Sequence, residues 1–253
     1  MGISLHNHSR YSDGSGTIEE IIAVARTKNL AIIGISDHFL LSPRYRRIPG
    51  CMSEKQLEGY LEAVNAFKGK PGPEVRAGLE VDFFPETARE IEAAVKSRPF
   101  DYLIGSVHII DDVLIDAAPE RLPPGARSLY GLPFEEQKLT LKRYWELILQ
   151  MAESGLFDIA AHLDLPKKYG LNAAAGFEDE IAAVLKAIKK GRMMVELNTS
   201  GWHYPCQEQY PSVAILKQCK KLDIPIIISA DAHKPEDIDR DFDKAEALLA
   251  PPV

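Results

Sequence analysis

The chain has 253 residues, enough for one large α/β domain or two smaller ones, and its 45% apolar and 26% charged residues are typical of a globular protein. The net charge of -7 disfavours a non-specific nucleic-acid binder, which usually carries a basic surplus. No apolar run approaches the roughly 18 residues of a membrane span, and no basic-then-apolar leader opens the chain. We therefore expect a soluble, cytoplasmic protein without a membrane partner.

Short apolar, β-branched runs alternate with longer segments of helical period. The predicted strands cover residues 3–8, 31–36, 75–81, 102–108, 157–162, 193–198 and 224–229. The predicted helices cover residues 17–28, 53–68, 86–97, 134–154, 176–190, 211–222 and 235–249. Thr17 with Glu20 and Ser53 with Gln56 form capping boxes at two helix starts. Seven βα units with nearly all-apolar strands predict a parallel sheet covered by helices. Because no break in composition marks a second domain, we expect one closed α/β barrel over residues 1–253.

One connection is unusually long and has no clear periodicity. It runs from Asp111 to Pro133, is rich in proline and glycine, and follows a strand end. Loops of this length in compact domains are usually functional or mobile, so we interpret it as a lid over the active-site face. Three widely spaced cysteines, Cys51, Cys206 and Cys219, form no CxxC pair and are predicted to be free thiols.

Side chains that bind metals follow the same end of every predicted strand. In the stretch LHNHSRYSDG, His6 and His8 share one face of the first strand because strand side chains alternate. A barrel gathers the carboxyl ends of its strands into one small area. The candidates gathered there are His6, His8, Asp37, His38, Glu80, Asp82, His108, His162, Asp164, Glu196, Asn198, Asp231 and His233. So many imidazoles and carboxylates share a small space only if cations organise them, although any one of these histidines alone could be structural.

Imidazole and carboxylate ligands without thiolates suit zinc, manganese or iron. About nine candidate ligands, at three or four per ion, predict two or three divalent ions. Two such ions roughly 3.5 to 4 Å apart generate a hydroxide nucleophile at neutral pH and stabilise an in-line displacement at phosphorus. The favoured chemistry is therefore hydrolysis of a phosphate ester.

The ordered motifs HNHSRYSDG, SDH at 36–38, GLEVDF, GSVH, AHLDL and SADAH resemble those of the PHP (polymerase and histidinol phosphatase) superfamily over nearly the whole chain. GSVHII, RYWELILQMAESGLFDIAAHLDLPKKYG and the run from ELNTSG to SADAH look like its histidinol-phosphatase branch. This resemblance implies a distorted (β/α)7, TIM-like barrel with a trinuclear metal site. It also implies hydrolysis of L-histidinol phosphate to L-histidinol and phosphate in histidine biosynthesis.

The resemblance also implies a ligand set. It assigns His6, His8, Glu80 and Asp231 to a first ion, Glu80 with His108 and His162 to a second, and His38 with His233 to a third. Asp13 is the candidate for the remaining ligand, and a plain turn residue in SDGSG is the alternative. In the implied mechanism a hydroxide between the first two ions attacks phosphorus. Asp231 or a nearby histidine, with His233 as the candidate, protonates the leaving alkoxide, and Glu80 bridges the two ions.

Substrate contacts are less specified by the sequence. Lys167 and Lys168, and also Arg10, are candidates for binding phosphate, with a solvated basic pair as the alternative for the lysines. Trp202 and His203 are candidate substrate contacts or solvated loop residues. The remaining candidates are Arg44, Arg46 and Arg47 for the phosphate, and Glu196, Asp82, Asp111, Asp112 and Tyr169 for an imidazole and an ammonium group.

Two stretches depart from the family pattern. Many relatives have a basic residue after NTSG, where this chain reads Trp202 and His203, and DDVLID after His108 is also unusual. These changes leave the predicted metal ligands intact and bear on the substrate. A PHP phosphoesterase for another small phosphate ester or a nucleotide is therefore a second hypothesis, and a metal-binding module without turnover is a third. The expected partner is a small phosphate ester and not a nucleic acid, and the oligomeric state is left open.

Overall fold

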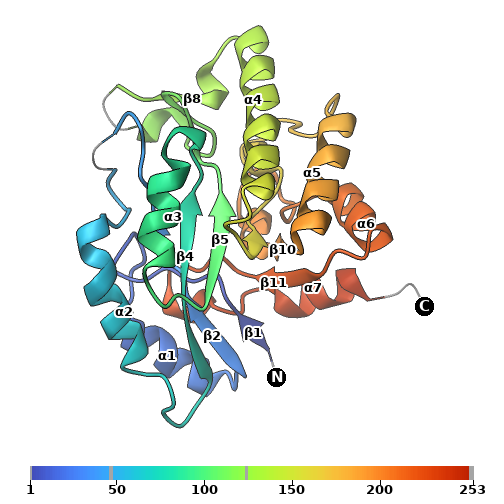
Figure 1. Cartoon of the computed structure of the whole chain (residues 1–253). Coiled ribbons are helices and arrows are strands. Elements are labelled where there is room, and N and C mark those ends of the chain that lie inside the picture. Colours follow the sequence, from blue (N-terminus) through green and yellow to red (C-terminus); the bar gives the residue numbers. More distant parts are fainter. Residues whose placement is uncertain (1, 46–47, 123–124, 251–253) are drawn as a thin grey trace.

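The computed structural model describes residues 2–45, 48–122 and 125–250 (Figure 1). Its main sheet contains seven parallel strands, paired side by side in the order β1-β2-β4-β5-β9-β10-β11. They are β1 (Ile3–Ser4), β2 (Ile32–Ile35), β4 (Glu74–Asp82), β5 (Tyr102–Ser106), β9 (Ile159–Ala160), β10 (Met194–Asn198) and β11 (Ile226–Ser229). A short extra strand, β3 (His38–Phe39), pairs with the carboxyl half of β4. All seven predicted strands are thus present, although β1 and β9 are shorter than expected.

The first and last strands meet just beyond their carboxyl ends. The backbone N–H of His8 donates to Ala232 O at 2.8 Å, and the N–H of Ala232 donates to His6 O at 3.2 Å. Asn7 thereby forms a parallel bridge with Ala232. The ring of strands is nearly closed, and the predicted distorted (β/α)7 barrel is confirmed.

The helices connect successive strands and lie around the outside of the sheet (Figure 1). They are α1 (Ile18–Thr27), α2 (Leu57–Asn65), α3 (Ala88–Lys96), α4 (Phe134–Glu153), α5 (Glu178–Gly191), α6 (Val213–Lys221) and α7 (Phe242–Leu249). Both predicted capping boxes form, at Thr17 before α1 and at Ser53 before the 3-10 turn that leads into α2. The last helix begins later than predicted, because Asp241 has a left-handed φ of 60° that a right-handed helix cannot include.

The predicted irregular connection is partly ordered. Strands β6 (Ile109–Ile110), β7 (Val113–Leu114) and β8 (Arg127–Ser128) form a small separate sheet. Asp112 and Arg127 tie this sheet together, with Arg127 Nε donating to Asp112 Oδ2 at 2.9 Å. The segment therefore has a framework of its own, which the missing periodicity did not predict.

The barrel interior is filled by a small apolar cluster of Leu5, Tyr102, Ile104, Ile159 and Ala161. Tyr102 reaches across from β5 and its hydroxyl donates to the carbonyl of Leu5. A Cβ at Gly34 or Gly78 would lie 2.1 or 2.3 Å from the Tyr102 side chain, so both positions require glycine. A larger cluster between strands and helices contains Trp145 and Tyr144. Among the described residues, no helix is long and apolar enough to cross a membrane.

Candidate active site

The predicted metal ligands meet at the carboxyl ends of the barrel strands. A first group joins β1 to β11, with His8 Nε2 3.0 Å and His6 Nε2 3.5 Å from Asp231 Oδ1. His6 Nε2 also lies 3.1 Å from Glu80 Oε2, at the end of β4. These distances bring together the four residues that the resemblance assigns to a first ion.

A second group surrounds Glu80, whose side chain is fully buried. Its Oε1 lies 2.9 Å from His162 Nε2 and 3.6 Å from His108 Nε2. Its Oε2 lies 2.8 Å from His38 Nδ1. Glu80 therefore contacts imidazoles on both sides of its carboxylate, which is the arrangement expected of a bridging ligand.

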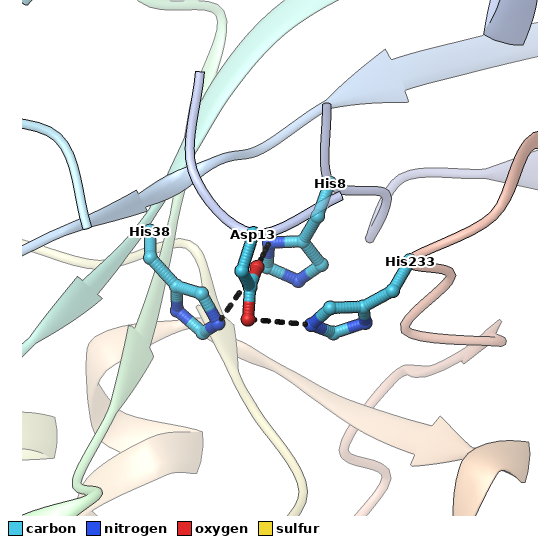
Figure 2. A group of neighbouring side chains, drawn as sticks. All are labelled: His8, Asp13, His38 and His233. Carbon is cyan, nitrogen blue, oxygen red and sulfur yellow. Dashed lines mark hydrogen bonds and ion pairs between the residues drawn. The ribbon is translucent and has the colours of Figure 1, made fainter. Parts of the chain in front are cut away.

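Asp13 lies at the centre of a third group (Figure 2). His233 Nε2 is 3.2 Å from Asp13 Oδ2, whereas His38 Nε2 and His8 Nδ1 are 3.8 and 3.9 Å from Asp13 Oδ1. One ligand atom from each of these four residues lies within 4.8 Å of the ligand atoms of the other three. Asp13 thus lies where the predicted remaining ligand would be. His8 contributes its Nδ1 to this group, whereas its Nε2 belongs to the first group.

The donor atoms fit divalent ions. Among the described residues, His6 Nε2, His8 Nδ1 and Glu80 Oε2 are buried without a hydrogen-bond partner, although unsatisfied buried polar atoms are rare and costly. The set of imidazoles and carboxylates is also the one that Zn²⁺, Mn²⁺ or Fe²⁺ accepts. Cations shared by these atoms would satisfy them together.

The carboxylates and imidazoles shift one another's protonation. Burial raises the pKa of Glu80, but the neighbouring His38, His6 and His108 outweigh it and hold that pKa well below its usual range. Burial lowers the pKa of His108, but Asp82 and Glu80 outweigh it and raise that pKa to about 10. Burial and the repulsion of His233 and His38 lower the pKa of His8 to about 3. The cluster therefore keeps its carboxylates ionised and ready to bind positive charge.

Glu196 at the end of β10 holds two of the predicted ligands from behind. Its Oε1 lies 2.5 Å from His6 Nδ1 and accepts from Ser229 Oγ. Its Oε2 accepts from the His162 backbone N–H at 2.7 Å and from Asn198 Nδ2 at 3.0 Å. With Nδ1 bonded to a carboxylate, His6 presents Nε2 to the cluster. Glu196 is buried and fully bonded, so it is not the free substrate acceptor that the sequence suggested.

Two aspartates orient the other side of the cluster. Asp82 Oδ1 accepts from the His108 backbone N–H at 2.7 Å and lies 3.1 Å from His108 Nδ1. Asp37 is fully buried and accepts from the backbone N–H groups of Ser9 and Ser12, at 2.8 and 3.0 Å. Asp37 thereby fixes the turn that carries Asp13.

A cavity of about 530 Å³ opens over the cluster. Asp82, Asp116, Lys168, Tyr204 and Tyr210 line it beside the predicted ligands. Lys168 Nζ lies 3.0 Å from Asp116 Oδ2 and 4.3 Å from the ring centre of Tyr204. Of the predicted phosphate-binding residues, Lys168 is thus at the cavity, and the segment predicted as a lid contributes Asp116 to the same wall.

Four other predicted substrate contacts do not line this cavity. Arg10 is exposed and its Nε donates to Ser15 O in its own loop. Lys167 points into a separate hollow, where its Nζ lies 2.8 Å from Glu208 Oε2. Trp202 packs its ring 3.8 Å from Lys244 Nζ, and His203 Nε2 lies 2.6 Å from Asp241 Oδ2. These side chains have partners elsewhere, and their roles as substrate contacts stay predictions.

Several further candidates also lie away from the cavity wall. Arg44 contacts Asp111 at 3.4 Å on an exposed surface, and Asp112 pairs with Arg127. Tyr169 packs against Tyr130 and Tyr204, behind the wall. Arg46 and Arg47 lie outside the described residues.

Arg240, Asp237 and Lys234 also line the cavity, and none of them was among the predicted site residues. All three lie in the connection between β11 and α7, beyond the SADAH motif. The predicted helix 235–249 included Asp237 and Arg240, which therefore were not considered as loop residues at the end of a strand. A signal was available in the run DRD at 239–241, which interrupts the helical period.

Comparison with known proteins identifies the family to which the chain belongs. The model of the PHP domain matches residues 4–200. The chain belongs to the PHP domain family. A probable histidinol-phosphatase of Deinococcus radiodurans is 31% identical to this PHP protein over 88% of the chain and 83% of the relative.

Two solved structures are similar to the whole PHP barrel. A histidinol phosphate phosphatase of Lactococcus lactis, complexed with zinc, L-histidinol and phosphate, has a TM-score of 0.80 at 22% identity, covering 98% of this chain and 92% of the other. A putative histidinol phosphatase of Listeria monocytogenes has a TM-score of 0.78 at 19% identity, covering 96% and 99%. At these identities the likeness supports the fold.

Proposed function

We propose that this PHP protein is a metal-dependent phosphatase that hydrolyses L-histidinol phosphate to L-histidinol and inorganic phosphate. The observation that carries the proposal is the cluster of six imidazoles with Asp13, Glu80 and Asp231 beneath one cavity. The relative in Deinococcus radiodurans, named a probable histidinol-phosphatase, supports the choice of substrate. The solved Lactococcus lactis enzyme, bound to zinc, L-histidinol and phosphate, has the same fold.

We propose two or three divalent ions, of zinc, manganese or iron, held by the three groups described above. The ligands would be His6, His8, Asp13, His38, Glu80, His108, His162, Asp231 and His233. When bound, such ions supply Lewis-acid stabilisation of the phosphate oxygens and lower the pKa of water. The rest of the reaction depends on the positions and protonation of the chain's own side chains.

Asp231 is the proposed group that moves the proton. Burial raises its pKa, but His6, His8 and His233 outweigh burial and hold that pKa well below its usual range. Asp231 is thus a carboxylate before the reaction. A low pKa makes it a weak base, so it would take the proton of the attacking water because bound ions would make that water more acidic. It then returns this proton to the oxygen that leaves phosphorus, so that the products are the alcohol and inorganic phosphate. His233, which contacts both Asp231 and Asp13, orients this carboxylate.

The cavity wall suits a substrate that carries both a negatively charged phosphate and a positively charged group. Lys168 offers an ammonium group to the phosphate. Burial lowers the pKa of Lys168, but Asp116 outweighs burial and raises that pKa, so the ammonium group stays charged. Asp82 and Asp116 offer carboxylates to an imidazole or ammonium group, and Tyr204 and Tyr210 supply aromatic surface. A phosphate ester that carries cationic groups matches this mixed wall better than a plain alkyl phosphate does.

A phosphate-release panel tests the proposal. Protein loaded with Mn²⁺ or Zn²⁺ is assayed with L-histidinol phosphate, glycerol phosphate, p-nitrophenyl phosphate and a dinucleotide. We expect kcat/KM for L-histidinol phosphate to exceed that of the other substrates by about 100-fold or more, since about two extra polar contacts discriminate it. Similar values across the panel would remove the substrate assignment, and a preference for the dinucleotide would support a nucleotide phosphoesterase instead.

A further inference from the structure

The cavity over the cluster of predicted metal ligands has five carboxylates among its lining residues. Asp13, Asp82, Asp116, Asp231 and Asp237 all line it. Phosphate esters are anions near neutral pH, so a wall of this kind repels the substrate unless positive charge faces it. Bound ions would supply part of that positive charge next to the cluster, and the rest must come from basic side chains of the cavity wall.

Among the described residues, three lysine and arginine side chains line the cavity, and they differ in how many of their donors already have a partner. Lys168 is committed to Asp116 at 3.0 Å and to the ring of Tyr204. Lys234 is exposed. Arg240 is the one arginine among the described residues of the wall, and its guanidinium is partly buried.

The Arg240 guanidinium is only partly satisfied. One terminal nitrogen, Nη1, donates to Asp237 Oδ2 at 3.0 Å. Its Nε is buried and has no hydrogen-bond partner among the described residues. A guanidinium has five N–H donors in a flat fork, and this fork matches the oxygens of a phosphate group. A buried donor without an acceptor is costly, which favours an arrangement in which an anion joins it.

The backbone around Arg240 is fixed from two sides. Its carbonyl accepts from Thr199 Oγ1 at 2.8 Å, in the turn that follows β10, and its N–H donates to Asp237 O at 2.9 Å. Ile238 is buried, and its carbonyl accepts from Ser4 Oγ at 2.6 Å beneath β1. Ser200, one residue beyond Thr199, lines the same cavity. The backbone that carries Arg240 is therefore fixed by β1 and by the turn that follows β10, and the guanidinium itself is bonded to Asp237.

We propose that Arg240 is a second anion-binding residue of this cavity, in addition to Lys168, and contacts the phosphate group of the substrate. The assignment rests on the proposed phosphatase function for the identity of the ester, but not for the anion itself. Asp237 acts as a positioning residue, because it holds one edge of the guanidinium and leaves the other donors to the ligand. Arg240 thereby adds positive charge to a wall that also carries five aspartates.

The test uses Arg240→Gln and Arg240→Lys in the metal-loaded protein, with Arg143→Gln as the control. Arg143 is a partly exposed arginine on α4 that pairs with Glu146 and does not line this cavity. Inorganic phosphate is titrated into each variant by calorimetry, and KM, kcat and bound metal are measured in parallel. L-Histidinol, which lacks the phosphate, is titrated as a second ligand.

We expect Arg240→Gln to weaken phosphate binding about 10- to 100-fold, since a charge-assisted hydrogen bond is lost. KM for the ester should rise, while L-histidinol affinity and metal content stay within about twofold of wild type. Arg240→Lys should recover part of the loss, and Arg143→Gln should change nothing. Unchanged phosphate affinity in Arg240→Gln would overturn the proposal, and so would an equal loss for both ligands or a loss of metal.

Failure of the proposed function gives a different result. If wild-type protein does not hydrolyse L-histidinol phosphate, the kinetic comparison ends there. The titration with inorganic phosphate still reports whether Arg240 binds an anion, and bound metal with thermal stability still reports whether the variant is intact. The two proposals can therefore fail independently.

Discussion

Replacing Glu196 by glutamine tests whether the cluster depends on support from behind. The Glu196 carboxylate faces four donors, in two pairs, with His6 Nδ1 and Ser229 Oγ on one oxygen and the His162 backbone N–H and Asn198 Nδ2 on the other. An amide keeps one accepting oxygen and turns an NH2 group toward the second pair. Whichever way it is oriented, donors then face donors in a buried site.

The size of the effect follows from this count. Each buried donor left without an acceptor costs about 1–3 kcal/mol, and His6 and His162 are the two predicted ligands that Glu196 holds. A change of about 1.4 kcal/mol corresponds to tenfold in an equilibrium constant. We therefore expect Glu196→Gln to lower metal affinity about 10- to 100-fold, as is usual when the partner of a ligand histidine is lost.

The assay is a competition between the protein and a chelator of known affinity, followed by elemental analysis. Glu246→Gln, an exposed position on α7, is the matched control and should bind metal as wild type does. Thermal unfolding of both variants in excess chelator separates loss of metal from loss of fold. Metal affinity within about twofold of wild type in Glu196→Gln would show that the hydrogen bonds of Glu196 to His6 and His162 contribute nothing to metal binding.

Three further outcomes are expected. Asp231→Ala should abolish turnover and lower the bound metal, as measured by phosphate release and elemental analysis, and full retention of either would count against its role. Metal binding should release protons at pH 7, because carboxylates outweigh burial and raise the pKa of His108 to about 10 and because Asp13 and Asp231 outweigh burial and raise that of His233 to about 9. Calorimetry in buffers of different ionisation enthalpy should show this release decline as the pH rises through 9 to 10, and a constant release would contradict it. Gly78→Ala should destabilise the barrel by about 1–3 kcal/mol in denaturant unfolding, since its Cβ would overlap the Tyr102 ring, and an unchanged midpoint would be inconsistent with the packing described.

The barrel and the ligand cluster could be predicted because each depends on a simple rule. Apolar strands alternating with amphipathic helices favour a parallel barrel, and a parallel barrel gathers whatever follows each strand. His6, His108 and His162 are far apart in sequence, yet each follows a different strand of the ring. Their meeting needs no knowledge of the loops. The register of Asp13 was harder, because it depends on a turn that Asp37 ties down from another strand.

The substrate wall could not be predicted in the same way. Lys167 and Lys168 are adjacent in the sequence, yet one points into a separate hollow and the other into the cavity. The direction of each depends on the 3-10 turn at Leu165–Lys167 and on partners from distant segments, Glu208 and Asp116. Loop side chains follow no period, so sequence patterns give their chemistry but not their direction.

The most direct test of the central claim is anomalous X-ray diffraction from crystals of the protein grown with Mn²⁺ or Zn²⁺. We expect two or three strong anomalous peaks between the carboxyl ends of β1, β4 and β11, each within about 2.0–2.3 Å of imidazole nitrogens or carboxylate oxygens of the cluster. Crystals from metal-saturated protein with no peak among these side chains, or with peaks only on the outer surface, would contradict it.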